Sequence, residues 1–505
     1  MTNKKQFSIN LIINGLNFLV NVAIGLLMTP FLVNHLGIAS FGLVQIAISI
    51  AIYGSILSTS LNQSNNRFVS ISLAKDSQKK ISTLLNTILT LYSSSFLLIL
   101  PFLLLVAFYP NLIFNVEDKL LSSASYLFLL IGISQLFVMQ TTAFMSPLYA
   151  NNRLDIIQLI NILRNSLKLI LVFILILFFS NSLLSVGIAF FIASIIAVVI
   201  AYINFKKYVP FYKYNFKDFN WLDAKKILYL SGWTVIAVLG NLIFLQTDII
   251  LINIFLGSEK SGEFAVLIQW TILLISLTSV LSVVISPIIL NKYTYQKIDE
   301  LKEIFYQSIK FQGIYTAIPV ALLFIYADTI LSLWLSEKFV YLAPYLQVMI
   351  IHFAVVQSTR QLLTINTAYN NMKWHANITL LIGFFHIILS ILLLKYTNFG
   401  IWTIIISNLF FTLILNLGFL SSYVSKYLSE PVYKIYLNIL PAIATQVFVM
   451  IFAYLLKYFL EPNTWFTLTL SLILSFLIVL PFIYFLLLTS KEKLVINKFL
   501  KNRFQ

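Results

Sequence analysis

The chain has 505 residues, of which 60% are hydrophobic and 10% charged, and its mean hydropathy of +0.94 lies far above the range of soluble globular domains. The absence of cysteine excludes disulfides, thiolate metal sites and cysteine nucleophiles, and the four histidines show no metal-ligand spacing. We therefore expect an integral membrane protein with no bound metal and no cofactor.

Apolar stretches long enough to cross a bilayer as helices recur along the whole chain. They predict an all-α polytopic membrane protein with about fourteen transmembrane helices. The first stretch follows two lysines, as in a signal peptide, but it is too long and lacks a small-residue cleavage site, so we expect it to remain as the first span. The predicted spans cover residues 7–33, 41–62, 83–109, 120–146, 156–179, 184–205, 227–255, 264–290, 311–327, 341–367, 376–394, 401–424, 435–457 and 465–488.

Lysine and arginine are distributed unevenly between the predicted loops. If the N-terminus is cytoplasmic, 25 of the 33 basic residues fall on the inner side, as the positive-inside rule requires. This predicts that both termini are cytoplasmic, and it attributes most of the net charge of +16 to topology rather than to nucleic-acid binding. The basic segment 206–226 interleaves six lysines with aromatic residues. It fits a cytoplasmic linker or a segment that binds specific lipids.

Two short motifs recur at an offset of 220 residues. LGIASFG at 36–42 returns as LGSEKSG at 256–262, and YANNR at 149–153 returns as YNNMK at 369–373. We expect a duplicated six-span unit in which both copies have the same orientation and a central cavity lies at their interface. The first glycine of each LG motif should adopt a left-handed backbone conformation where one helix ends and the next begins.

The repeat predicts the domain organisation. The expected parts are an N-terminal six-helix lobe at 1–205, a cytoplasmic linker at 206–226, a C-terminal six-helix lobe at 227–424, and two additional helices with a basic cytoplasmic tail at 425–505.

The first span carries an amide stripe within NLIINGLNFLVN. At about 100° per residue its asparagines fall within roughly 60° of one another on the helix surface. Their side chains could exchange hydrogen bonds with sugar hydroxyls and cavity water, or with neighbouring helices, and the sequence leaves both interpretations open. The four residues are Asn10, Asn14, Asn17 and Asn21.

Three basic residues lie deep inside predicted spans: Arg164 and Lys168 in the fifth, and Arg360 in the tenth. A charge at the bilayer centre costs about 2.5–3.5 kcal/mol, so each should face protein or a water-filled cavity. Helical spacing places Asn161 near Arg164 and Gln357 near Arg360. A diphosphate dianion would match this excess of buried positive charge.

Asp248, in the seventh span, is the one acid that we expect to be buried. It shares a helix face with Asn241, because the two are seven residues apart. Asp248 either neutralises one of the buried cations across the cavity or, with Asn241, binds a coupling ion or proton.

These features together resemble the polysaccharide (oligosaccharidyl-lipid) flippases of the multidrug/oligosaccharidyl-lipid/polysaccharide exporter superfamily. The resemblance rests on fourteen spans in two lobes, L-G-x4-G after spans one and seven, the acid in TDIILI, and Y-x-N-x-[RK] after spans four and ten. It implies alternating-access transport of undecaprenyl-diphosphate-linked oligosaccharide repeat units from the inner to the outer leaflet of the bacterial cytoplasmic membrane. The transport would serve surface polysaccharide biosynthesis, as of O-antigen or capsule.

The resemblance also implies partners. These are the lipid-linked oligosaccharide diphosphate, membrane lipids and other membrane proteins of polysaccharide assembly. Coupling to a proton or a sodium gradient remains open.

Two other functions compete with this interpretation. A drug/cation antiporter of the same superfamily would share the fold, but it has a twelve-span core, and a cationic drug suits an acidic cavity better than three buried cations. A membrane polysaccharide polymerase or ligase would need a large outer loop with catalytic residues, and the predicted outer loops are short. We therefore expect a transporter rather than an enzyme.

Overall fold

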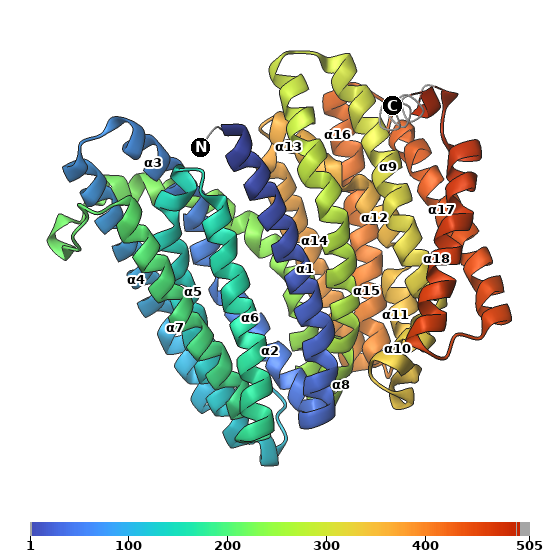
Figure 1. Ribbon diagram of the computed structural model, residues 1–505, viewed down its shortest axis with the longest axis horizontal. Helices are drawn as coiled ribbons and strands as arrows, with labels where there is room; N and C mark the ends of the chain where they lie inside the picture. Colours follow the sequence, from blue (N-terminus) through green and yellow to red (C-terminus); the bar gives the residue numbers. More distant parts are fainter. Residues whose placement is uncertain (1–2, 491, 495–505) are drawn as a thin grey trace. The chain divides into compact units, whose positions relative to one another are not determined.

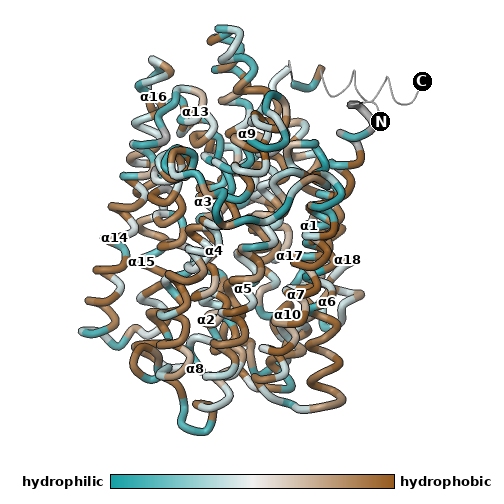
Figure 2. Tube along the Cα trace, turned by 90° about the vertical axis from the view of Figure 1, so that its left-hand side faces the viewer, coloured by the Kyte–Doolittle hydropathy of each residue, from teal (hydrophilic) through white to brown (hydrophobic). Residues whose placement is uncertain are grey.

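The computed structural model describes residues 3–490 and 492–494 (Figure 1). These residues form helices and connecting turns, and this part of the chain contains no strand. Hydrophobic residues cover most of the length of the helices (Figure 2). The predicted all-α fold is confirmed.

Within the described residues, eighteen labelled α-helices follow one another along the chain, and α8 contains a break at Gly257. They are α1 (Asn3–Leu36), α2 (Ile38–Gly54), α3 (Ile56–Lys75), α4 (Gln78–Phe108), α5 (Leu121–Ala150), α6 (Leu154–Phe178), α7 (Leu183–Tyr208), α8 (Trp221–Thr294), α9 (Ile298–Ile325), α10 (Ala327–Trp334), α11 (Ala343–Ile350), α12 (Phe353–Ser358), α13 (Leu362–Ala368), α14 (Met372–Tyr396), α15 (Ile401–Leu413), α16 (Ser421–Leu428), α17 (Tyr433–Leu460) and α18 (Trp465–Phe482). Short 3-10 turns lie at Pro110–Leu112, Asp118–Leu120, Phe216–Asp218, Glu337–Leu342 and Thr359–Gln361, and π-helical segments lie at Ile414–Leu420 and Ile483–Leu487.

The number of membrane spans agrees with the sequence. Within the described residues, 13 helices are long and apolar enough to cross a bilayer, and the bent pair α2 and α3 raises this number to 14. This pair, which bends by 42°, contains the second predicted span. The protein is therefore a multi-pass membrane protein, as predicted.

Two spans differ from their predicted form. α9 begins at Ile298, well before the predicted start at 311, because its first turns carry charged residues that a hydropathy pattern excludes although they favour a helix. The tenth predicted span, 341–367, is not continuous. It consists of α11, α12, the 3-10 turn Thr359–Gln361 and α13, and hydropathy does not detect such breaks.

The chain forms two compact units. Unit 1 comprises the described residues of Met1–Gln269 and Thr379–Ile404, and unit 2 those of Trp270–Ile378 and Ile405–Gln505. In unit 1, α5 and α6 pack against α7, and α1 packs against α6; in unit 2, α9 packs against α12 and α17. The predicted lobes, 1–205 and 227–424, remain a prediction.

The basic linker is tied to α4 within unit 1. The buried Tyr212 donates its hydroxyl to Asn86 Oδ1 at 2.7 Å, the backbone N–H of Asn215 donates to the same oxygen at 3.1 Å, and the N–H of Asn220 donates to Thr87 Oγ1 at 3.0 Å. Burial raises the pKa of Tyr212 above its ordinary value. The linker thus has a defined path, and its binding of specific lipids remains a prediction.

The two LG motifs contain glycines with the same unusual backbone conformation. Gly37 has φ 83° and ψ 163°, and Gly257 has φ 89° and ψ 177°. The positive φ confirms the prediction, but ψ is extended rather than helical, a region that only glycine adopts readily. Gly257 thereby breaks α8 into two helices, at the point where the sequence predicts the end of one span and the turn to the next.

The two copies of the motif also pack against each other inside unit 1. A Cβ atom on Gly42 would lie 2.4 Å from the carbonyl oxygen of Ser258, and one on Gly262 would lie 2.0 Å from the carbonyl oxygen of Ile38. The contact is reciprocal, because residues 42 and 258 correspond to residues 262 and 38 at the offset of 220. Small residues allow the two helix backbones to approach this closely.

This close approach makes both glycines sensitive to an added methyl group. We expect Gly42→Ala and Gly262→Ala each to force the helices apart and to destabilise unit 1 by about 1–3 kcal/mol. Gly15→Ala is the control, because a Cβ at Gly15 would meet no atom within 4 Å. The measurement is thermal unfolding of the purified protein in detergent. Equal unfolding midpoints for all three variants would contradict the packing argument.

Candidate functional site

The amide stripe of α1 faces the polar side of α6. Asn17 Nδ2 donates to Gln158 Oε1 at 2.8 Å, and Asn165 Nδ2 donates to Asn21 Oδ1 at 2.7 Å. The helices α1 and α6 pack against each other (Figure 1). Asn14, which is exposed, donates to the backbone oxygen of Asn10 within its own helix at 2.8 Å. The stripe thus pairs two helices and leaves part of its amide surface exposed.

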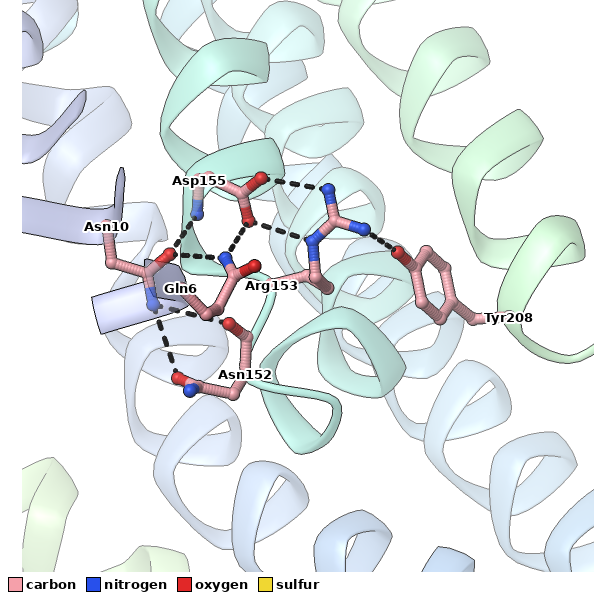
Figure 3. Close-up of polar contacts among 6 residues, drawn as sticks. All are labelled: Gln6, Asn10, Asn152, Arg153, Asp155 and Tyr208. Atoms are coloured by element: carbon pink, nitrogen blue, oxygen red, sulfur yellow. Dashed lines mark hydrogen bonds and ion pairs between the residues drawn. The ribbon is translucent and has the colours of Figure 1, made fainter. Parts of the chain in front are cut away.

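Asn10 uses its whole amide for contacts within the protein (Figure 3). Its Oδ1 accepts from Gln6 Nε2 and from the backbone N–H of Asp155, both at 3.0 Å. Its Nδ2 donates to the backbone oxygen of Asn152 at 3.2 Å and to Asn152 Oδ1 at 3.3 Å. Asn10 therefore caps the first turn of α6 from the beginning of α1. The predicted contacts of the four asparagines with substrate remain predictions.

Arg153 completes this network on the other side. Its Nε and Nη2 donate to the two oxygens of Asp155 at 3.0 and 2.9 Å, and its Nη1 donates to the hydroxyl of Tyr208 at 2.5 Å (Figure 3). The hydrogen bonds that Arg153 donates to the Asp155 carboxylate raise the pKa of Arg153 above its ordinary value. Asp155 is buried, so the prediction of Asp248 as the one buried acid is wrong. Hydropathy places Asp155 just before a span, and only the fold shows that α1 covers it.

The turn before α6 has a counterpart before α14, although not in the predicted register. Asn152 and Asn370 both have φ 55°, and the N–H of the next residue reaches back to Leu148 O in one turn and to Asn366 O in the other. The two turns therefore correspond at an offset of 218, whereas the Tyr-Asn motifs align at 220. The two turns therefore share a backbone conformation, although their positions differ by two residues from the alignment of the sequence motifs.

Arg164 and Lys168 lie one turn apart on α6, on the same face as Asn161 and Asn165. Both cations are half-buried. Lys168 Nζ lies 4.7 Å from the ring centroid of Phe190. Neither forms an ion pair with an acidic side chain in the described part of the chain. Two like charges at this spacing repel each other, and a bound anion would relieve the repulsion.

Arg360 occupies the 3-10 turn Thr359–Gln361 in unit 2. Its Nη1 donates to Gln357 Oε1 at 3.3 Å, which confirms that these two residues share a face. A contrasting buried cation in the same unit, Lys310, pairs with Glu492 at 2.6 Å. Arg360 forms no such ion pair within the described residues, so it offers charge to an external group.

A neutral polar cluster lies next to Arg360 in the sequence and within unit 2. Gln361 Nε2 donates to Gln312 Oε1 at 3.3 Å, and Thr364 Oγ1 donates to Gln361 Oε1 at 2.9 Å. The hydroxyls of Ser286 and Thr364 are 2.8 Å apart, and Gln312 Nε2 donates to Ser282 Oγ at 2.8 Å. The sequence did not indicate that Gln312, Ser282 and Ser286 belong to this cluster, because they lie on helices other than the segment that carries Gln361 and Thr364.

Asp248 on α8 pairs with a histidine that the sequence did not single out. His386 Nε2 lies 2.7 Å from Asp248 Oδ1, and both residues are buried. The ring of Phe244 lies parallel to the His386 ring, with centroids 5.6 Å apart, and Ser390 Oγ lies 3.5 Å from His386 Nδ1. Asn241, the other predicted coupling residue, is exposed. In the sequence, the one feature that could have indicated a role for His386 is its position within an apolar span.

No metal site accompanies these residues. Within residues 3–490 and 492–494, no group of three His, Asp or Glu side chains is arranged to hold a metal ion.

Comparison with known proteins places the chain in a family. The family model described as "Polysaccharide biosynthesis protein" matches residues 7–292. The chain is similar to the "Uncharacterized membrane protein EpsK" of Bacillus subtilis (strain 168), with 28% identity over 505 residues that cover 99% of each chain.

Two solved structures share the fold. One is the lipid II flippase MurJ in an inward closed conformation, with a TM-score of 0.68, 18% identity and coverage of 94% of this chain and 98% of that chain. The other is an inward-facing multidrug resistance MATE family transporter of the MOP superfamily, with a TM-score of 0.65, 14% identity and coverage of 82% and 94%. Both likenesses concern the fold.

The network around Asn10 predicts a large difference between two asparagines of one stripe. Asn10→Leu removes the acceptor of the buried Asp155 N–H, and a buried group left unpaired costs about 1–3 kcal/mol, whereas Gln6 keeps its bond to Asp155 Oδ1 and Asn152 is exposed. Asn14→Leu is the control, because that side chain is exposed and bonds only to its own helix. We expect the first variant, and not the second, to lower the midpoint of thermal unfolding in detergent. Similar midpoints for the two variants would argue against the capping role.

Proposed function

The chain belongs to the polysaccharide biosynthesis protein family, and from this premise we propose that it transports a lipid-linked oligosaccharide diphosphate across the bacterial cytoplasmic membrane. One structural observation supports the proposal beyond the family. Arg164 and Lys168 lie one turn apart on a membrane-spanning helix without a carboxylate partner among the described residues. Two neighbouring cations in a membrane span cost energy, and a bound anion would offset this cost.

A diphosphate fits the face of α6 chemically. Its two phosphates can each accept charge-assisted hydrogen bonds from one of the two cations, and such bonds are stronger than those between neutral groups. The amides of Asn161 and Asn165 on the same face, and of Asn21 opposite them, can bond to hydroxyl groups without adding charge. Charge would thus hold the diphosphate, and the amides would contact the adjoining sugars.

Arg360 and Gln357 provide a second anion-binding element in unit 2. They lie where the helix is interrupted, and discontinuous helices commonly form the substrate sites of transporters. In our proposal this element binds substrate in one stage of the transport cycle.

The proposed direction is the one that the family resemblance implies, and the distribution of basic residues predicts only the orientation of the chain in the membrane. Both termini and the linker 206–226 are cytoplasmic, and the substrate, built on undecaprenyl diphosphate, moves from the inner to the outer leaflet by alternating access. The product would serve the assembly of a surface polysaccharide, such as O-antigen or capsule, together with other membrane proteins of that assembly. No step of this function needs a catalytic residue.

Loss of either cation on α6 should reduce transport. We expect Arg164→Gln and Lys168→Gln each to lower the rate by about 10- to 100-fold, because a hydrogen bond to a charged group contributes about 1.5–3 kcal/mol. Arg164→Lys should retain more activity than Arg164→Gln, since it keeps the charge. The measurement is translocation of a fluorescent lipid-linked oligosaccharide in proteoliposomes. Lys338→Gln, at an exposed lysine outside the proposed sites, is the control, and wild-type rates in both glutamine variants would refute the proposed site.

We assign ion coupling to Asp248, with Asn241 on the same helix. The hydrogen bond between Asp248 and His386 joins α8 to α14, and Tyr53 of α2 also interacts electrostatically with Asp248. A proton or sodium ion taken up here changes the charge of a buried pair. That change can shift the balance between two conformations if they expose the pair to different sides of the membrane.

Asp248→Asn keeps the shape of the side chain and removes its charge. We expect it to abolish the response of transport to an imposed pH or sodium gradient while substrate still binds, and we expect His386→Gln to weaken that response. Glu117→Gln, at a partly exposed acid, is the control. Proteoliposomes with and without each gradient provide the measurement. An Asp248→Asn variant that responds like the wild type would reduce Asp248 to a structural counter-charge.

A further inference from the structure

Five aromatic rings form a continuous series in unit 2, which we call the aromatic chain. The ring centroids of Tyr293 and Tyr369 are 4.8 Å apart, those of Tyr369 and Tyr427 5.4 Å, those of Tyr427 and Tyr423 4.9 Å, and those of Tyr423 and Trp374 6.4 Å. Each distance lies within the range of direct aromatic pairing. The predicted topology places this end of the helices at the cytoplasmic side.

Three separate segments contribute to the aromatic chain. Tyr293 lies at the end of α8, Tyr369 and Trp374 lie on either side of the turn between α13 and α14, and the remaining two rings lie one turn apart on α16. The turn depends on Asn370, whose φ of 55° reverses the chain direction. It therefore brings the end of one helix and the start of the next to the same neighbouring helix.

The aromatic chain combines flat apolar surface with polar groups. Trp374, at one end, has 57% of its surface exposed, and the four tyrosines are half-buried. The Tyr427 hydroxyl donates to that of Tyr423 at 2.6 Å. The neighbouring residues in sequence include the exposed Lys373 and Lys426. Sugar rings present the matching chemistry, because their C–H faces pack on aromatic rings and their hydroxyls bond to phenols, amides and ammonium groups.

A structural role alone does not account for five rings at this turn. The turn at Asn152 in unit 1 has the same backbone conformation, and there an ion pair between Arg153 and Asp155, with Tyr208, occupies the adjoining space. Trp and Tyr are enriched at membrane interfaces, but this enrichment does not require the rings to contact one another in series. The aromatic chain is therefore more than either the turn or the interface requires.

We infer that the aromatic chain is a carbohydrate-binding surface for the sugar part of the lipid-linked substrate, with Trp374 as its accessible platform. This inference rests on the proposed function and adds to it a site that acts on the glycan rather than on the diphosphate. Binding here would select substrates that carry sugars over the bare lipid diphosphate.

The test compares two ligands on the purified full-length protein in nanodiscs. One is the lipid-linked oligosaccharide extracted from the organism that makes this protein, and the other is undecaprenyl diphosphate without sugars. We expect Trp374→Ala and Tyr423→Ala each to weaken binding of the first ligand by about tenfold and to leave binding of the second unchanged. Trp374→Phe should retain most of the affinity because it keeps a ring. Trp465→Ala, at a 52% exposed tryptophan at the start of α18, is the matched control.

Different failures lead to different conclusions. If the alanine variants weaken both ligands equally, the rings anchor the helices in the lipid headgroup layer, and the inference is wrong. It is also wrong if neither ligand is affected while Arg164→Gln weakens both, although the proposed function then stands. If the wild-type protein binds neither ligand, the proposed function fails and this inference fails with it. Should Trp374→Ala not fold, Trp374→Phe and Tyr423→Ala decide the outcome.

Discussion

A bilayer core provides no water to satisfy polar groups, and most features of this protein follow from that constraint. Every amide and charge within the helices must pair with protein, reach a wet cavity or meet a ligand. The buried cluster around Gln6, Asn10 and Asp155 meets the requirement entirely within the protein. The result is a fixed connection between the start of α1 and the start of α6.

The same constraint makes the unpaired cations informative. Two other cations have acidic partners: the half-buried Arg153, just before α6, pairs with Asp155, and the buried Lys310, within α9, pairs with Glu492. The cations farther along α6, Arg164 and Lys168, have no acidic partner in the described residues. Arg360 in unit 2 likewise has no acidic partner among the described residues, and in the proposed function a bound anion offsets the energetic cost of these charges.

The duplicated motifs have the same backbone conformation in both copies but different side chains around it. Gly37 and Gly257 both separate consecutive helices, and the glycines six residues after Leu36 and Leu256 meet in a reciprocal contact. The turns at Asn152 and Asn370 share one backbone conformation but differ in their surroundings, an ion-pair network in unit 1 and the aromatic chain in unit 2. The backbone is the same in each pair, whereas the side chains around it have diverged.

The sequence by itself determined the all-helical membrane fold, the number of spans and the positive φ of Gly37 and Gly257, because hydropathy and glycine conformation act locally along the chain. It also identified Arg164, Lys168 and Arg360, because a charged residue in an apolar span can be recognised in the sequence before its neighbours in space are known. Only the tertiary structure decided that the Asn10 amide forms its hydrogen bonds within the protein and that Asp155 is buried. It also decided that His386 pairs with Asp248, 138 positions away, and that five aromatic rings meet in unit 2. The physical reason is that a helix pattern shows which face is polar but not which residues of distant helices lie opposite it.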